Sequence, residues 1–441
     1  MLPPATPPPG RGIYCNRTLN VRAIRAVGYD MDYTLIHYDV AAWEARAFAY
    51  LQQKLNEPGR PAVDVPFDPA AMVRGLVIDT HLGNIVKADR FGYVKRAAHG
   101  TRRLEFESQR RTYGRTLVDL SERRWVFLNT FFSLSEATMY ALLVDQLDAG
   151  RLPAGVGYLD LWRRVRQALD QAHAEGRMKA EIIEAPDRFV QLDPEAPAAL
   201  LDQKQAGKKL LLVTNSEWAF TRAMMRYAFD RYLPAGMTWR DLFDMVIVGA
   251  RKPEFFSTDQ PLYEVVSDEG LLRPCTSVAS AGGVFHGGNA GLVEEHLGVS
   301  GAEILFVGDH LYTDVRVSKD VRRWRTCLIV RELEDELAEV ARMAPRQEAL
   351  DRLMTRKAAV EYEQAWWRLQ AQRRGSHPEK GAEATHESVE TRLAALREES
   401  DQLEREVGPL AAALGALSNP HWGPLMSAGA GHSLLARQLE D

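Results

Sequence analysis

Four runs of apolar residues stand out in the hydrophobic pattern of the chain, and polar side chains follow each of them directly. The runs are Ala23–Tyr29, Lys209–Ser216, Phe243–Pro253 and Ile304–Asp314. Apolar runs of this length without regular polar alternation are typical of parallel strands that are buried on both faces. A shorter run at Thr326–Val330 closes the series. The pattern predicts an α/β fold with a Rossmann-like parallel sheet as its core.

The chain between the first two of these strands is too long for an ordinary connection. We therefore expect residues 41–199 to form a large inserted domain, and 21–40 together with 200–331 to form the core. Strand and turn signals in the first part of the insert lie at Gly75–Asp79, Gly83–Val86 and Phe91–Val94. Helical periodicity follows at Ser135–Leu147 and Tyr158–Ala174.

The last part of the chain, residues 332–441, is charged and predicted to be a helical extension. Its apolar positions follow three- and four-residue steps at Val389, Leu393, Leu396, Leu403, Val407 and Leu410. This spacing predicts a short amphipathic helix or a coiled-coil hairpin. Packing on a neighbouring helix of the same chain is favoured over an intermolecular coiled coil, because the run spans only about three heptads. We still expect a homo-oligomer.

Composition excludes several classes of protein. The 441 residues have a formal net charge of -5 and no basic stripe, so a nucleic-acid partner is not expected. Three widely separated cysteines lack metal-ligand spacing and suggest free thiols in a reducing compartment. No segment approaches the roughly 18 apolar residues of a membrane helix. The proline-rich residues 1–20 are expected to be disordered, and the protein to be cytoplasmic.

The first apolar run leads into two carboxylates, Asp30 and Asp32, which are followed by Thr34. Because side chains alternate along a strand, Asp30 and Asp32 would point to the same side of its carboxyl end. Open α/β sheets bind their ligands at that edge. Two anions held so close repel each other unless a cation lies between them. The pair therefore predicts Mg²⁺ and a phosphorylated substrate.

The other three strands also end in polar side chains. These are Thr214, Asn215, Ser216, Lys252, Asp309 and Asp314. Taken singly, Thr214 to Ser216 could be a helix N-cap, and Lys252 a surface lysine. Together and in this order, the segments resemble the four motifs of the haloacid dehalogenase (HAD) superfamily of phosphotransferases.

That resemblance implies a role for each motif residue. Asp30 would attack phosphorus and form an aspartyl-phosphate. Asp32 would protonate the leaving ribose oxygen and then deprotonate water, with its pKa raised by the neighbouring carboxylate. Lys252 would neutralise charge. The phosphate oxygens would be bound by Thr214 and by the backbone N–H groups of the two residues after it, Asn215 and Ser216.

The same resemblance implies how Mg²⁺ would be held. Its expected ligands are the Asp30 carboxylate, the Asp32 backbone carbonyl and Asp309, with waters completing the shell. Asp314 would orient the metal's waters or Lys252. In this superfamily an insert at the position of residues 41–199 is a cap over the active site.

Further segments narrow the resemblance to the purine 5′-nucleotidase family, whose typical member prefers IMP and GMP. They are Leu82–Leu104, Phe127–Glu136, Ala250–Phe256 and Trp422–Gln438. The residues that the resemblance places at the substrate are Asn129, Phe132, Arg166, Asp170, His173 and Lys179. Phe132 would stack on the base, while Arg166 and Asp170, four residues apart on one helical face, would read its edge. An ordinary core aromatic and an ordinary surface ion pair explain the same residues without a ligand.

The sequence leaves three functions open. The preferred one is a Mg²⁺-dependent 5′-nucleotidase for purine nucleoside monophosphates. A second is a phosphatase of the same mechanism that acts on another phosphomonoester. The third is a catalytically weak interaction protein on a nucleotidase fold, which the complete set of clustered carboxylates disfavours because they destabilise a fold that binds no metal.

Overall fold

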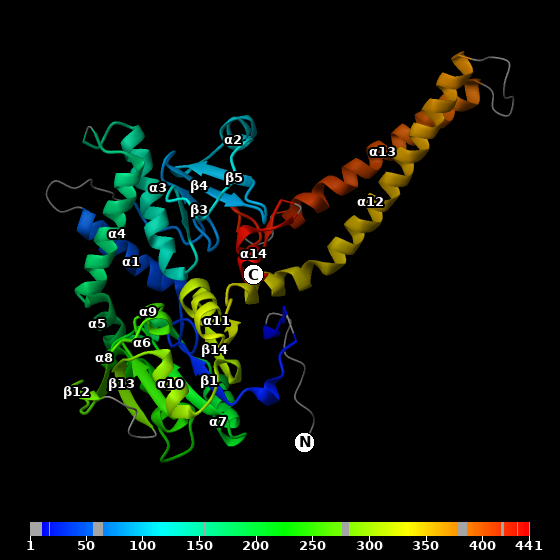
Figure 1. Ribbon diagram of the computed structural model, residues 1–441. Coiled ribbons are helices and arrows are strands. Elements are labelled where there is room, and N and C mark those ends of the chain that lie inside the picture. The colour runs from blue at the N-terminus through cyan, green and yellow to red at the C-terminus, as the bar shows by residue number, and fades with distance from the viewer. Residues whose placement is uncertain are drawn as a thin grey trace. The chain divides into compact units, whose positions relative to one another are not determined.

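The computed structural model describes residues 11–16, 18–55, 65–153, 155–275, 282–376, 386–415, 419–429 and 431–440 (Figure 1). Disorder was expected for residues 1–20. Of these, residues 1–10 and residue 17 lie outside the described ranges. The chain divides into two compact units. One contains Tyr14–Arg331 and Leu425–Asp441, and the other contains Glu332–Pro424 together with the described residues of Met1–Ile13.

An eight-stranded sheet forms the core of the first unit, in the order β12-β11-β13-β10-β9-β1-β14-β15. The strands in this order are β12 Leu272–Cys275, β11 Leu262–Val265, β13 Gly283–Gly287, β10 Met245–Val248, β9 Lys209–Val213, β1 Ala26–Tyr29, β14 Ile304–Gly308 and β15 Arg325–Leu328. From β13 to β15 every neighbouring pair is parallel. The predicted parallel α/β sheet is thus confirmed, and β1, β9, β10 and β14 correspond to the first, second, third and fourth of the predicted runs.

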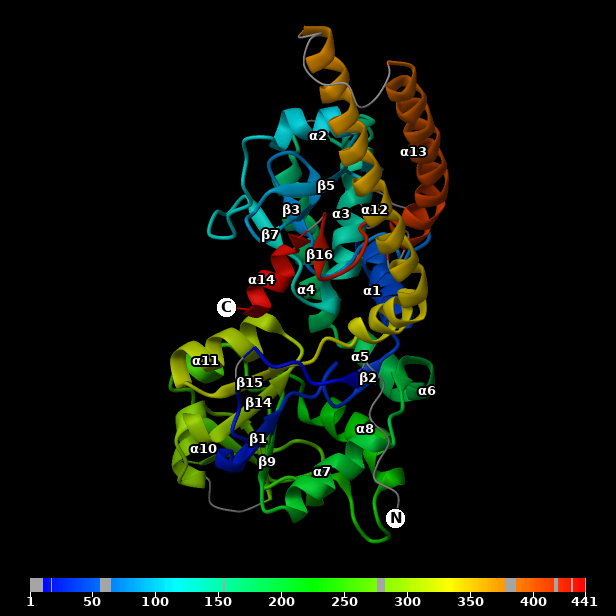
Figure 2. The ribbon, with the colours of Figure 1, turned by 90° about the vertical axis from the view of Figure 1, so that its right-hand side faces the viewer.

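Helices cover both faces of this sheet. Figure 2 shows α10 and α11 on one side and α7 and α8 on the other. Their bounds, with those of the short α9, are α7 Glu195–Gln205, α8 Trp218–Phe229, α9 Glu254–Ser257, α10 Ala290–Leu297 and α11 Val317–Arg322. Phe256, Phe306 and Trp324 pack edge to face at the centre of one apolar layer. This packed apolar layer supports the strands whose ends carry the motif residues.

A second, antiparallel sheet lies in the chain between β1 and β9, in the order β6-β5-β4-β3-β7. Its strands are β3 Val77–Asp79, β4 Asn84–Ala88, β5 Val94–His99, β6 Arg102–Arg103 and β7 Trp125–Phe127. The accompanying helices are α1 Val40–Leu55, α2 Phe106–Tyr113, α3 Leu134–Asp148, α4 Tyr158–Ala174, α5 Arg177–Glu184 and α6 Pro186–Phe189. A small antiparallel pair, β2 His37–Tyr38 with β8 Val190–Gln191, joins the two ends of this segment.

The strand and turn signal at Phe91–Val94 falls mainly on a turn, and β5 begins at its last residue, Val94. The side chain of Asp89 accepts hydrogen bonds from the N–H groups of Phe91 and Tyr93, and Gly92 has a φ of 89°. This local turn delays the strand, because a carboxylate that binds nearby backbone N–H groups competes with strand pairing.

The C-terminal segment returns to the antiparallel sheet. It contains β16 Ser427–Ala428, β17 Gly431–His432 and α14 Leu434–Glu440. Ser433 forms an antiparallel bridge with Asp89, and the N–H of Arg90 donates to the carbonyl of His432 at 2.9 Å. Leu434 belongs to the apolar cluster of β3 and β4. The tail therefore completes one edge of this core and is no part of the helical extension.

The other unit is a helical hairpin of α12 Leu333–Ser376 and α13 His386–Gly415. Val360 on α12 packs with Leu396 and Leu403 on α13, and the Gln364 side-chain amide donates to the Leu396 carbonyl at 2.8 Å. The predicted apolar spacing in α13 therefore serves packing within the same chain, the reading that the sequence favoured.

Candidate active site

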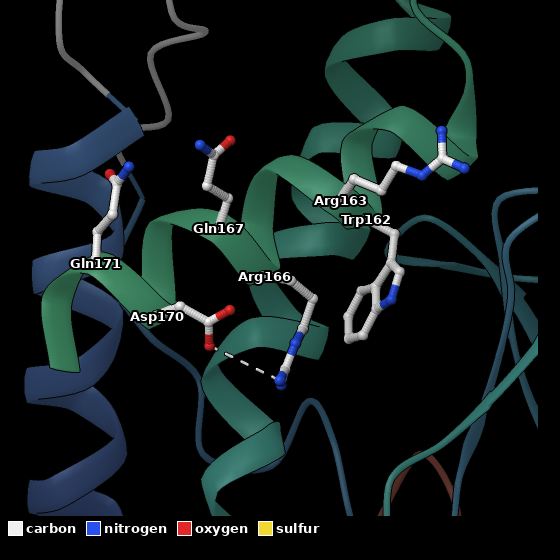
Figure 3. A pocket seen from close by; sticks show the side chains of 6 residues that line it. All are labelled: Trp162, Arg163, Arg166, Gln167, Asp170 and Gln171. Atoms are coloured by element: carbon white, nitrogen blue, oxygen red, sulfur yellow. Dashed lines mark ion pairs between the residues drawn. The ribbon is translucent and has the colours of Figure 1, made fainter. Parts of the chain in front are cut away.

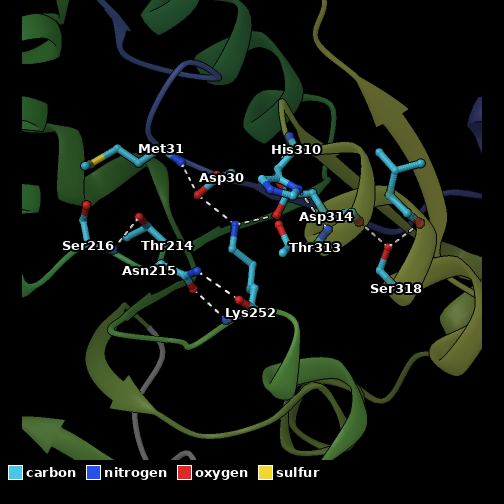
Figure 4. Close-up of polar contacts among 11 residues, drawn as sticks. Asp30, Met31, Thr214, Asn215, Ser216, Lys252, His310, Thr313, Asp314 and Ser318 are labelled. Atoms are coloured by element: carbon cyan, nitrogen blue, oxygen red, sulfur yellow. Dashed lines mark hydrogen bonds and ion pairs between the residues drawn. The ribbon is translucent and has the colours of Figure 1, made fainter. Parts of the chain in front are cut away.

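The polar residues of the four motifs converge where neighbouring parallel strands end (Figure 4). Asp30 follows β1, Thr214 follows β9, and Asp309 follows β14. Lys252 lies in the loop after β10. Since β10, β9, β1 and β14 are consecutive in the sheet, their carboxyl ends form one continuous edge.

A buried lysine lies at the centre of this edge. The Lys252 Nζ is 2.8 Å from Oδ1 of Asp30 and 2.8 Å from Oδ1 of Asp314, and its side chain is 1% exposed. Burial alone would lower the Lys252 pKa, but the two carboxylates outweigh it, so the pKa is raised and the amine stays charged. Burial raises the pKa of Asp30 to about 6, although Lys252 opposes this shift.

The carboxylates outnumber the lysine, which makes the cluster suitable for a metal ion. Asp30, Asp309 and Asp314 each present a carboxylate oxygen, and these oxygens lie within 4.8 Å of one another. The Oδ2 atom of Asp309 is buried and has no hydrogen-bond partner among the residues that the structure describes. Burial, followed by Asp314 and Asp30, raises the Asp309 pKa well above its usual value. A hard divalent cation fits this all-oxygen donor set, because it would stabilise the buried negative charge.

Asp32 has a different environment from Asp30. Its Oδ1 accepts a hydrogen bond from the Tyr38 hydroxyl at 2.6 Å, and its Oδ2 accepts one from the Ser216 hydroxyl at 2.7 Å. Its pKa is raised, as the sequence predicted, but burial is the main cause and the Asp30 carboxylate comes second. A carboxyl group with a raised pKa is suited to hold a proton and return it.

The segment after β9 fixes the lysine loop. The Asn215 side chain accepts a hydrogen bond from the Lys252 N–H at 2.6 Å and donates to the Lys252 carbonyl at 3.1 Å. The Thr214 hydroxyl accepts from the N–H of Ser216 at 3.1 Å. Of the two backbone N–H groups expected to bind phosphate, that of Ser216 is therefore already paired with Thr214.

Sequence reasoning missed two residues at this site, Tyr38 and Arg74. Arg74 comes from the chain just before β3 and is 2% exposed. Its positive charge opposes the raised pKa of Asp309, and it adds to the effect of burial in lowering the His310 pKa to about 4. The only local signal was an arginine within an apolar stretch before a glycine, Gly75, with a φ of 88°.

Two further substrate candidates, Asn129 and Phe132, come from the chain just before α3. The ring centroid of Phe132 is 5.0 Å from that of Tyr33 and 5.4 Å from that of Trp43. Phe132 is half-buried, so part of its ring is available to a flat ligand, whereas Tyr33 and Trp43 are buried. Asn129 is also half-buried and lies two residues before the 3-10 turn Phe131–Ser133.

Arg166 and Asp170, two of the candidates on α4, line a separate pocket (Figure 3). Its lining residues all come from α4 and are Trp162, Arg163, Arg166, Gln167, Asp170 and Gln171. Arg166 donates to both carboxylate oxygens of the buried Glu136 at 3.0 Å, whereas Asp170 is 3.8 Å away and 67% exposed. The main partner of Arg166 is thus Glu136, and the expected pair with Asp170 is the weaker contact.

The remaining two candidates differ in what the structure shows. Lys179 on α5 has its Nζ 3.6 Å from a carboxylate oxygen of Glu217 and 5.2 Å from the ring centroid of Phe220. Its charge also opposes the raised pKa of Asp32, which connects α5 with the motif residues. His173 lies in α4, but its side chain is outside the described part of the structure.

This donor set, buried carboxylates and a lysine at the carboxyl edge of a parallel sheet, is typical of an enzyme that transforms an anionic ester. The sequence matches the profile of the 5' nucleotidase family over residues 13–441, and the chain belongs to that family. It is a phosphoric monoester hydrolase that acts on nucleoside 5′-monophosphates. Human 5'-nucleotidase domain-containing protein 1 is 27% identical over 361 residues, which cover 76% of this chain and 77% of the human protein.

None of the helices in the described ranges combines the length and the apolar character that crossing a bilayer requires.

Proposed function

We propose that the chain hydrolyses purine nucleoside 5′-monophosphates, with IMP and GMP preferred, through an aspartyl-phosphate on Asp30 and with Mg²⁺ as cofactor. The observation that best supports this proposal is the buried Asp30–Lys252–Asp314 cluster beside the unpartnered Oδ2 of Asp309. Free thiols at all three cysteines suit a cytoplasmic location.

The two carboxylates of the first motif have complementary roles. Asp30 attacks phosphorus, and the bond from phosphorus to the ribose O5′ breaks while Asp32 gives its proton to that oxygen. Water then attacks the phosphorus of the aspartyl-phosphate, Asp32 takes the proton back, and the bond to the Asp30 carboxylate breaks. The hydrogen bonds from Tyr38 and Ser216 hold Asp32 in place through both proton transfers.

Mg²⁺ would be held by the carboxylates of Asp30 and Asp309 and by the Asp32 backbone carbonyl. When bound, it supplies positive charge that offsets the phosphate dianion. Lys252 adds a second fixed positive charge, and Asp314 holds that lysine in position. Thr214 and the N–H of Asn215 would bind phosphate oxygens. The lysine is needed because a carboxylate and a phosphate dianion repel each other.

Recognition of the base is proposed for the segment between β2 and α7, acting as the cap of a HAD-like fold. The half-buried ring of Phe132 would stack on the purine. Arg166, fixed by Glu136, would donate to a purine carbonyl, and Asp170 would accept from a purine N–H. Asn129, His173 and Lys179 complete the proposed substrate set, with Lys179 reaching toward the phosphate.

Initial rates on a panel of IMP, GMP, AMP, pyrimidine monophosphates and a small aryl phosphate, with and without Mg²⁺, test the proposal. The highest kcat/KM should be found with IMP and GMP, and only when Mg²⁺ is present. A higher kcat/KM for a non-nucleotide ester would favour the alternative phosphatase. No turnover of any ester with any divalent cation would favour an interaction protein.

A further inference from the structure

The hairpin helix α12 has a second apolar stripe on the side opposite to α13. The face that packs on α13 contains Leu353, Val360 and Trp367. The opposite face contains large apolar side chains that remain exposed, namely Tyr362 77%, Trp366 46% and Leu369 48%. At 3.6 residues per turn these three residues lie within about 60° of one another around the helix axis, so they form one stripe along the helix. Isolated exposed apolar residues are ordinary, but a continuous stripe marks an interaction surface.

The sequence along this stripe is complementary to itself when it is reversed about Tyr362. Asp351 lies eleven residues before Tyr362, and Arg373 lies eleven residues after it. Ala358 lies four residues before it, and Trp366 four residues after it. An antiparallel copy of the same helix would therefore place each Trp366 over the small Ala358 of the other. The same pairing places Asp351 opposite Arg373 at both ends of the stripe.

We propose that this stripe binds a second copy of the chain, with the two α12 helices antiparallel about a two-fold axis at Tyr362. In a two-fold interface, residue i contacts j and j contacts i, which is the relation that these pairs satisfy. An unrelated partner would need complementarity to this stripe but would give no reason for the stripe to match its own reverse.

The length of the stripe sets the strength of the dimer. From Asp351 to Arg373 the helix is roughly 33 Å long at about 1.5 Å per residue. One helix pair of this length buries an interface at or below about 1,200 Å², which is the range of weak complexes. The dimer should therefore be in equilibrium with the monomer at micromolar concentrations. The inference concerns α12 alone and holds whether or not the proposed substrate is correct.

Sedimentation velocity of the full-length chain across the micromolar range tests the proposal. The mass of the wild type should rise from one chain to two as concentration increases. Trp366→Glu should remain a monomer throughout, because a charge would be buried opposite Ala358. Phe106→Glu is the matched control, since Phe106 is 70% exposed but lies on α2. This variant should dimerise like the wild type.

A charge-reversal experiment tests the register. Asp351→Arg alone and Arg373→Asp alone should each be monomeric, because each would place like charges opposite each other. An equimolar mixture of these two variants should recover the dimer, since every opposed pair then has opposite charges. Circular dichroism and phosphate release should be unchanged in all variants, which shows that they fold.

Three results would overturn the proposal. The first is a wild type that stays monomeric up to high micromolar concentration. The second is a Trp366→Glu variant that dimerises as well as the Phe106→Glu control. The third is a mixture of the two charge variants that stays as monomeric as each variant alone, which would exclude the antiparallel register.

Discussion

Replacing Lys252 by Met should destabilise the apo-protein strongly, because it leaves buried carboxylates without their counter-charge. Each of the two 2.8 Å ion pairs of Lys252 is worth about 6 kcal/mol of direct attraction at an effective dielectric constant of about 20. Desolvation of the buried ions offsets most of this attraction. Removing one partner of such a buried pair costs about 3–5 kcal/mol, which is the loss we expect in the free energy of unfolding at pH 8.

The loss should depend on pH in a defined direction. Burial already raises the Asp30 pKa to about 6, and without Lys252 this pKa rises further. A carboxyl group with a raised folded-state pKa loses stability as pH rises from about 4 through that pKa. The difference between the Lys252→Met variant and the wild type should therefore be smallest near pH 5 and largest at pH 8. Urea titrations in the presence of EDTA at the two pH values measure it.

Lys209→Met provides the matched control. The Lys209 Nζ is 2.9 Å from Oδ1 of Asp244, a similar distance, but its side chain is 57% exposed. An exposed ion pair contributes at most about 1 kcal/mol to stability, so the free energy of unfolding of this variant should be close to that of the wild type at either pH. If the Lys252 and Lys209 variants lost the same stability, or if the loss at Lys252 did not grow with pH, the charge argument would be refuted.

Three further predictions concern other parts of the structure. Glu44 is 1% exposed, and burial raises its pKa to about 8. Between pH 6 and pH 8 the free energy of unfolding should therefore fall by about 2 kcal/mol more in the wild type than in Glu44→Gln, as measured by urea titration. Parallel pH profiles of the two proteins would refute this. Arg166→Ala should lower kcat/KM for IMP by a factor that corresponds to about 1–3 kcal/mol and leave turnover of a small aryl phosphate unchanged. An equal loss on both substrates would make Arg166 structural. In metal titrations, Asp309→Ala should require more Mg²⁺ for half-maximal activity, and an unaltered requirement would exclude it as a ligand.

The strands that position the site could be predicted because their apolar runs are local and their polar ends are distinctive. Those around β1, β9, β10 and β14 are of this kind. β13 was missed, because Gly283–Gly287 is short, begins and ends with glycine and contains a histidine. Its strand character comes from pairing with β10 and β11, which no local pattern reveals. The contact of the C-terminal tail with Asp89 could likewise not be predicted from a local pattern, since the two segments are distant in sequence.

For the site, too, local patterns could be predicted from the sequence. Asp30, Lys252, Asp309 and Asp314 were each predicted from their place after a strand, and the structure brings them together. Contacts between distant segments outside the four motifs were not predicted. Arg166 was paired with Asp170 because a four-residue spacing is visible in the sequence, whereas its closer partner Glu136 lies thirty residues away on another helix. Arg74 and Tyr38 were missed for the same reason.

The most direct test of the account is phosphate release from IMP by wild-type protein and by Asp30→Asn, each with Mg²⁺ and with EDTA. An amide keeps the shape of the side chain but neither attacks phosphorus nor balances the charge of a cation. The wild type should turn over IMP only with Mg²⁺, and a folded Asp30→Asn variant should show no turnover above background in either condition. Turnover by Asp30→Asn within about tenfold of the wild type, a difference of only about 1.4 kcal/mol in the barrier, would contradict it.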